Sequence, residues 1–153
     1  MHNGFVDSFK LIRRHLMKDL SDEAFNLIEG NTDTEFCFAY FLNQLGMDKN
    51  ASLETLAANM ISMIENLRSA LTELEITSPS MLNFALTDGE NIILTRATSG
   101  EAERAPTLYF SETDDAVVFA SEPLSKLTDH WQKLPTNSLF IINKENEIEI
   151  LQL

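Results

Sequence analysis

The chain has 153 residues, which is the size of one domain, and its 44% hydrophobic and 23% charged residues are typical of a globular protein. Eleven Lys and Arg side chains against 24 Asp and Glu side chains give a net charge of −13, which argues against nucleic-acid and membrane partners. Because no apolar run is long enough to cross a membrane and no basic and apolar leader opens the sequence, we expect a cytoplasmic protein. The single cysteine, Cys37, excludes an internal disulfide, and three scattered histidines predict no metal site.

Two helices are predicted at the start of the chain. Apolar residues from Phe5 to Leu20 recur at spacings of three and four, which is typical of one face of a helix. Ser21 can then cap a short second helix, because its hydroxyl can accept a hydrogen bond from a free backbone amide of the first turn. Gly30 supplies the left-handed position that would end this helix.

Two further helices follow, each with its own start signal. The segment Thr32–Glu35 fits the capping box, in which a threonine hydroxyl and a glutamate carboxylate each accept from a backbone amide. We therefore expect a third helix with an aromatic and apolar body that ends at Gly46. Ser52 can cap a fourth and longest helix, whose apolar face continues for about six turns to Leu74.

Beyond Pro79 the pattern changes from helical spacing to short β-rich runs separated by turn residues. Asp88-Gly89 is a hairpin signal, because both positions tolerate the positive φ of a type I′ turn. The predicted class is therefore α+β, one domain over residues 1–153, with four helices followed by about six mostly antiparallel strands. The expected strands are 81–87, 91–96, 107–111, 116–121, 138–143 and 148–151.

Few residue patterns in this sequence indicate a catalytic or binding site. It contains no phosphate-binding loop, dinucleotide fingerprint or nucleophile elbow. Two local features remain, namely His2-Asn3-Gly4 before the first helix and the segment Asn31–Glu35 before the third helix. An isolated Asn-Gly is common in turns, and an isolated Asp33 can simply favour the positive end of a helix, by about 0.3–1 kcal/mol.

Taken together and in order, these features resemble the class II glutamine amidotransferases of the N-terminal-nucleophile (Ntn) hydrolase superfamily. The most similar branch is the small stand-alone type of ergothioneine synthesis and glutathione degradation. The motifs that carry the resemblance cover nearly the whole chain. They are His2-Asn3-Gly4, the Phe-x-x-x-Phe-x-x-Ile-Arg-Arg helix of residues 5–14, Ser21-Asp22-Glu23-Ala24-Phe25, Thr32-Asp33-Thr34-Glu35, residues 82–89, residues 120–124, and the ending Trp131 with residues 135–139.

The resemblance implies a fold and a reaction. The fold would be part of an Ntn-hydrolase αββα sandwich, with the chain as the C-terminal portion of a glutamine amidotransferase domain. The reaction would be hydrolysis of the side-chain amide of glutamine, or of a γ-glutamyl amide. In the family an N-terminal cysteine attacks this amide, its own α-amine acts as the base, and water then releases glutamate from a thioester. The family uses no cofactor in this step.

The resemblance also implies roles for three residues. Asn3 and Gly4 match the pair that forms an oxyanion hole from a side-chain amide and a backbone amide, where one lost donor costs about 2.7–4 kcal/mol of transition-state stabilisation. Asp33 matches the aspartate that binds the α-ammonium group of the substrate. His2 has no direct catalytic role in the family motif, so we expect it to pack and form hydrogen bonds behind the loop.

The chain departs from the family pattern at its start. Residue 1 is Met, and the family's nucleophile and carboxylate-binding residues, which precede His-Asn-Gly, have no counterpart here. Cys37 cannot replace the nucleophile, because it belongs to an apolar helix and buried cysteines behave as small hydrophobes. We therefore expect the chain alone to be inactive.

Three hypotheses remain open from the sequence. The chain is the C-terminal part of a glutamine amidotransferase, through a late start codon, a split gene or a degraded gene. Alternatively, it is a non-catalytic binding or interaction module that retains the fold. Thirdly, it is an unrelated acidic α+β protein whose motifs match by chance. The expected partners are glutamine or a γ-glutamyl small molecule, together with a complementary N-terminal fragment or further copies of the chain.

Overall fold

The computed structural model describes residues 1–113, 116–124 and 130–153. The described chain is α+β, as predicted, and no helix in it is long and apolar enough to cross a membrane. Its helices are α1 (Phe9–Met17), α2 (Asp22–Phe25), α3 (Asp33–Gln44), α4 (Leu53–Glu73) and the 3₁₀ turn η1 (Ala102–Arg104). Its strands are β1 (His2–Phe5), β2 (Met81–Thr87), β3 (Ile92–Arg96), β4 (Tyr109–Glu112), β5 (Val117–Ala120), β6 (Gln132–Lys133), β7 (Ser138–Ile142) and β8 (Ile148–Gln152).

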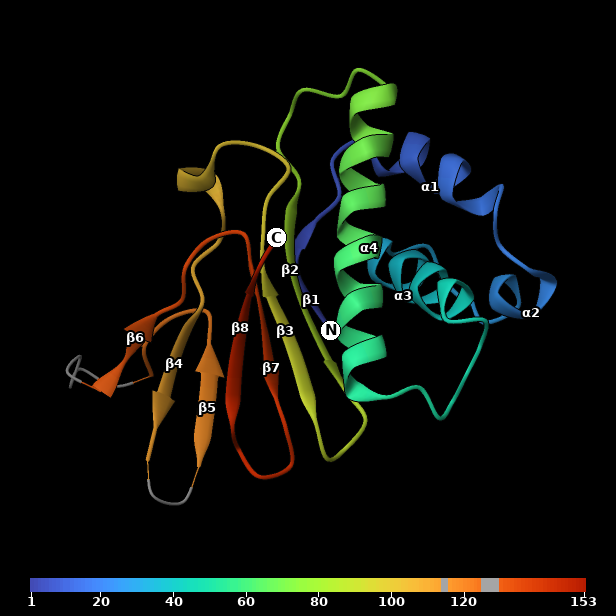
Figure 1. Ribbon diagram of the computed structural model, residues 1–153. Helices are drawn as coiled ribbons and strands as arrows, with labels where there is room; N and C mark the ends of the chain where they lie inside the picture. The colour runs from blue at the N-terminus through green and yellow to red at the C-terminus, as the bar shows by residue number, and fades with distance from the viewer. Residues whose placement is uncertain (114–115, 125–129) are drawn as a thin grey trace.

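The elements form three layers (Figure 1). A five-stranded antiparallel sheet of order β1-β2-β3-β7-β8 lies in the middle, and the α helices cover one of its faces. A three-stranded sheet of order β5-β4-β6 lies on the other side. The structure thus has one layer of helices and two layers of sheet. These are three of the four layers of the expected αββα sandwich.

Each side of the five-stranded sheet has its own hydrophobic core, because successive side chains of a strand point to opposite faces. Leu82, Ile93 and Leu139 pack against Ile64 and Leu67 of α4. On the opposite face, one cluster joins the two sheets, and its buried members are Leu94, Leu108, Leu134, Phe140 and Ile142. Strands β3 and β7 are therefore buried on both faces, which explains their uninterrupted apolar runs, Ile92–Leu94 and Leu139–Ile142.

The predicted starts of α2, α3 and α4 agree with the structure. The Ser21 and Ser52 hydroxyls accept hydrogen bonds from Ala24 N and Thr55 N, and Thr32 and Glu35 form both bonds of a capping box. The hydrogen bonds from Thr32 lower the pKa of Glu35 below its usual value. Residue Gly46 has a φ of 62° just after the end of α3.

Two predicted helix boundaries are wrong. Phe5 was expected in the first helix but ends strand β1, and α1 begins only at Phe9. Gly30 was expected to end the second helix in a left-handed conformation, yet α2 ends at Phe25 and Gly30 does not have positive φ. Instead Gly30 donates its backbone N–H to Glu35 Oε1 at 2.9 Å, so this glycine belongs to the start of α3.

The Asp88-Gly89 hairpin exists, but its turn differs from the predicted type I′. Gly89 has a φ of 99°, while Asp88 does not have positive φ. The Asp88 carboxylate accepts hydrogen bonds from Glu90 N at 2.9 Å and Asn91 N at 2.7 Å, which makes a wider loop between β2 and β3. These bonds and one from the Asn91 side chain lower the pKa of Asp88 to about 2.

Replacing Thr32 with alanine tests how α3 is fixed. We expect Thr32→Ala to lower the free energy of unfolding by about 1 kcal/mol, because Glu35 N loses its acceptor at the helix start. Thr72→Ala is the matched control, since its hydroxyl only returns to Arg68 O within α4, and it should change the value by less than about 0.5 kcal/mol. Urea unfolding of the three proteins measures both, and equal effects would contradict the role of the cap.

Candidate active site

The predicted Asn-Gly pair lies in an edge strand and not in a loop. Strand β1 pairs with β2 in the register His2↔Phe84 and Gly4↔Leu82, and nothing in the described chain pairs with its outer edge. Met1 exchanges two hydrogen bonds with Ala85, Met1 N to Ala85 O at 2.8 Å and Ala85 N to Met1 O at 2.9 Å. Antiparallel pairs alternate between bonded and non-bonded, so His2 and Gly4 are in non-bonded pairs. Their backbone N–H groups therefore point away from the sheet.

Asp33 binds the same outer edge of the chain just after the end of β1. Val6 is the next residue whose backbone N–H points outward, and it donates to Asp33 Oδ2 at 2.9 Å. Residues Gly4 and Val6 are about 6.8 Å apart along an extended chain. The structure therefore brings an outward backbone donor, Gly4 N–H, and the Asp33 carboxylate to one short stretch of the edge.

His2 is buried behind this edge, as expected. Its imidazole stacks on Phe84 with ring centroids 4.2 Å apart, and its Nε2 lies 2.8 Å from Met81 O. Its Nδ1 lies 3.6 Å from Asp33 Oδ1. A Cβ atom at Gly4 would lie 2.0 Å from Met81 O and 2.9 Å from His2 Nε2, so only glycine leaves room for the imidazole to reach that carbonyl.

The Asn3 side chain lies on the other face of the sheet, because neighbouring residues of a strand alternate. Its Nδ2 donates to Ser121 Oγ, directly after strand β5 of the smaller sheet. Ser121 is held by Thr107 Oγ1, which donates to Ser121 O at 2.8 Å. Asn3 and Asp33 therefore meet the sheet from opposite faces, and only the backbone of β1 joins them.

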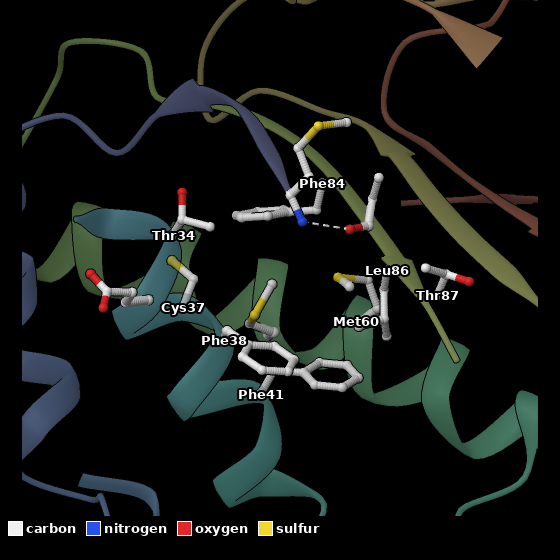
Figure 2. Close-up of a pocket in the computed structure, with 12 residues that line it drawn as sticks. Thr34, Cys37, Phe38, Phe41, Met60, Phe84, Leu86 and Thr87 are labelled. Atoms are coloured by element: carbon white, nitrogen blue, oxygen red, sulfur yellow. Dashed lines mark hydrogen bonds between the residues drawn. The ribbon is translucent and has the colours of Figure 1, made fainter. Parts of the chain in front are cut away.

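A pocket of about 330 Å³ lies beside Met1, between α3, α4 and the end of β2 (Figure 2). Its lining is mainly apolar, with Cys37, Phe38 and Phe41 of α3 facing Phe84 and Leu86 of β2. Neither the Asn-Gly pair nor Asp33 lines it. The pocket opens where β2 continues beyond the first residue of β1.

Cys37 faces this pocket but is only 1% exposed. Burial, with the negative charge of Asp33 as a second cause, raises the pKa of its thiol to about 12. A thiol of this kind is protonated at neutral pH and is a poor nucleophile. Among the residues that the structure describes, no three His, Cys, Asp or Glu side chains are grouped so that they could hold a metal ion.

Comparison with known proteins identifies the relatives of this chain. It is 32% identical to the "Probable glutamine amidotransferase DUG3" of Saccharomyces cerevisiae, over 95% of this chain and 49% of the yeast protein. The chain is thus similar in sequence to a glutamine amidotransferase. All of this chain also superposes on 66% of a solved glutamine aminotransferase class-II domain protein from Silicibacter pomeroyi, with a TM-score of 0.77 and 25% identity. No protein-family model matches the sequence.

These similarities decide one of the three hypotheses. An unrelated protein with chance motifs is excluded, because the likeness to the yeast protein extends over 95% of the chain. The chain spans about half the length of that relative. The comparisons do not assign the roles of Asn3, Gly4 and Asp33, which stay predictions.

Sequence reasoning missed several partners of these residues. The contact between Asn3 and Ser121 joins positions 118 residues apart, and no spacing predicts such a pair. Asp33 accepts a hydrogen bond from the backbone N–H of Val6. No sequence pattern indicates such a donor, because every residue except proline has a backbone N–H. One sequence signal for the Asn3 partner existed. Ser121 belongs to residues 120–124, one of the motifs that carry the family resemblance, although no role was assigned to it.

Substitution of Gly4 tests the register in which β1 pairs with β2. We expect Gly4→Ala to lower the free energy of unfolding by about 3 kcal/mol, because its methyl group would overlap Met81 O. Asn3→Ala, one residue away, should cost less than about 1 kcal/mol, since its side chain is exposed. Thermal or urea unfolding measures both changes. A stable Gly4→Ala protein would show that β1 does not pair with β2 in this register.

Reaction of Cys37 with iodoacetamide tests its environment. A pKa raised from 9.0 to about 12 lowers the thiolate fraction at pH 8 by about 1000-fold, so alkylation of the native protein should be slower by at least that factor than in urea. Mass spectrometry follows the reaction. Rapid labelling under native conditions would contradict the buried position and would restore Cys37 as a candidate nucleophile.

Proposed function

We propose that this chain forms the oxyanion-binding and ammonium-binding part of a class II glutamine amidotransferase of the Ntn-hydrolase type. The observation that carries the proposal is the outer edge of β1, where the N–H of Gly4 points outward and the Asp33 carboxylate accepts from the N–H of Val6, two residues further along the chain. A cysteine from outside residues 1–153 would attack the side-chain amide. We identify no nucleophile within the chain, since Cys37 is its single cysteine.

The reaction divides into two steps. The thiolate adds to the amide carbon, the C–N bond breaks, ammonia leaves with the proton taken from the thiol, and a thioester remains. Water then adds to the thioester and releases glutamate. In both steps negative charge develops on the former carbonyl oxygen, which is where the Gly4 N–H and the Asn3 amide would donate.

Asp33 would act in binding and not in the chemical step. A substrate α-ammonium carries the same charge before and during the reaction, so its ion pair with Asp33 stabilises both states alike. The carboxylate has about four acceptor sites, of which Val6 N and the Thr34 hydroxyl occupy two. Its side chain is 19% exposed, which leaves the outward sites accessible to a ligand.

A non-catalytic interaction module is the second candidate. Supporting observations are the apolar pocket beside Met1 and the open edge of β1, both of which could take an extended segment of another polypeptide. A complementary N-terminal fragment and a second copy of the chain are the two partners we propose. The DNA sequence upstream of Met1 separates this candidate from the first, since an in-frame continuation that ends in Met-Cys supports the enzyme.

We expect the purified 153-residue chain to release no glutamate from glutamine above background. Oxyanion donors without a nucleophile leave the attack undone. A coupled glutamate dehydrogenase assay measures the release. Turnover that persists in Cys37→Ala would require a nucleophile elsewhere in the chain and would contradict the proposal.

In a full-length or reconstituted enzyme, we expect the two kinds of residue to separate in steady-state kinetics. Asn3→Ala should lower kcat by about 10²–10³-fold with little change in KM, and Asp33→Ala should mainly raise KM for glutamine. Asp22→Ala is a matched control, because Asp22 is likewise the first residue of its helix, α2. Equal changes in both parameters for both variants would show that the roles are misassigned.

A further inference from the structure

Asn3 of β1 and Asn83 of β2 lie directly opposite each other in the register of the two strands. Their side chains therefore lie on the same face of the five-stranded sheet. Each side-chain amide donates from Nδ2, Asn3 to Ser121 Oγ and Asn83 to Pro106 O at 3.4 Å. Ser121 directly follows β5, and Pro106 lies shortly before β4. The two asparagines thus contact the two segments that flank the β4–β5 pair of the smaller sheet.

These two segments are also bonded to each other. Thr107, the residue after Pro106, donates from Oγ1 to Ser121 O at 2.8 Å. The contacts therefore form a closed ring, from Asn3 through Ser121, Thr107 and Pro106 to Asn83, and back across the paired strands to Asn3. Because both sheets contribute to this ring, it fixes the place of Ser121 Oγ beside Asn3.

The orientation of the Asn3 amide decides what it can do for an oxyanion. The amide has two N–H groups on Nδ2 and one acceptor, Oδ1. The last torsion of an asparagine side chain is broad, so an amide without a partner turns either its nitrogen or its oxygen toward a neighbouring group. An amide that turns Oδ1 toward a developing negative charge repels that charge. With one N–H donated to Ser121 Oγ, the amide is oriented and its second N–H is left for another acceptor.

We propose that Ser121 is a positioning residue that holds the Asn3 amide with its second N–H available to the oxyanion. Ser121 acts on the reaction through Asn3 and not through the substrate itself. This role in catalysis rests on the proposed function, whereas the contact between Asn3 and Ser121 does not. The inference also gives the smaller sheet a part in the reaction, because β4 and β5 place the residue that orients an oxyanion donor.

Relaxation NMR of the asparagine side-chain amides tests the contact on the 153-residue chain, with no substrate needed. In Ser121→Ala we expect the order parameter of the Asn3 Nδ2 group to fall below about 0.6, the range of flexible groups, because the amide loses its acceptor. The Asn83 amide is the internal reference and should keep its value, since it retains Pro106 O and Ala97 N as partners.

Two results of this measurement would overturn the proposal. An Asn3 order parameter that is the same with and without the Ser121 hydroxyl would show that Ser121 does not orient the amide. A fall of equal size at Asn3 and Asn83 would show that Ser121 stabilises the fold and not the Asn3 amide in particular.

Steady-state kinetics of the full-length or reconstituted enzyme tests the effect on the reaction. Ser121→Ala should lower kcat by at least about tenfold with less than about a twofold change in KM for glutamine, because the donor is needed only in the transition state. Ser121→Thr keeps the hydroxyl and should restore most of the rate. Ser138→Ala is the matched control and should leave kcat unchanged, since the Ser138 hydroxyl has no hydrogen-bond partner among the residues that the structure describes. An unchanged kcat in Ser121→Ala would contradict the positioning role.

A double-variant cycle shows whether Ser121 acts through Asn3. In an Asn3→Ala background, Ser121→Ala should lower kcat by less than about twofold, because the amide that Ser121 orients is gone. A loss as large as in the single variant would mean that Ser121 acts independently, which overturns the inference. The proposed function fails in a different way: if Asn3→Ala leaves kcat unchanged, Asn3 is not an oxyanion donor and Ser121 has no part in catalysis, while the NMR result still decides the contact.

Discussion

The hydrogen bond from Val6 N to Asp33 Oδ2 connects the start of α3 with the end of β1. Asp33 is the first residue of α3, and Val6, 27 positions earlier, directly follows the edge strand β1. Because Asp33 also starts the helix that Thr32 and Glu35 cap, the helix start and the strand edge are fixed relative to each other. Everything proposed for this edge depends on that attachment, since β1 has only four residues and a single strand partner.

The side chains of β1 make different contacts on the two faces of the sheet. On the helical face, the buried His2 ring stacks on Phe84, and its Nδ1 lies 3.6 Å from Asp33 Oδ1. On the face of the smaller sheet, Asn3 contacts Ser121, and the buried Arg96 guanidinium donates to Pro106 O and Leu134 O, which joins the two sheets. The smaller sheet thereby holds Ser121 beside the strand that carries the oxyanion donors.

The helices and most strands could be predicted from sequence because their signals are local. Caps at Ser21, Thr32 and Ser52 satisfy amides within three residues, and the strands alternate or are continuously apolar. Strands β1 and β6 were missed, since four residues with two polar side chains and a glycine, or only two residues, give no periodicity. The pairing of β1 is decided by partners far away in the sequence, such as Met81 for Phe5 and Phe84 for His2.

The sequence could predict which residues belong to the candidate site, but not how they are arranged. Asn3, Gly4 and Asp33 came from resemblance to a family, and the sequence could not indicate that Asn3 and Asp33 approach from opposite faces. Nor could it indicate that the Gly4 amide points outward, because that direction follows from the alternation of bonded pairs in an antiparallel ladder. A shift of one residue in register would turn this amide toward β2 and remove the oxyanion donor.

The register of β1 against β2 is therefore the central claim, and proton NMR tests it most directly. Non-bonded antiparallel pairs bring their α-protons closest together. The account predicts strong contacts between the α-protons of His2 and Phe84 and between those of Gly4 and Leu82. Strong contacts between the α-protons of Asn3 and Asn83 instead would show that Gly4 N–H is bonded within the sheet, which would contradict the account.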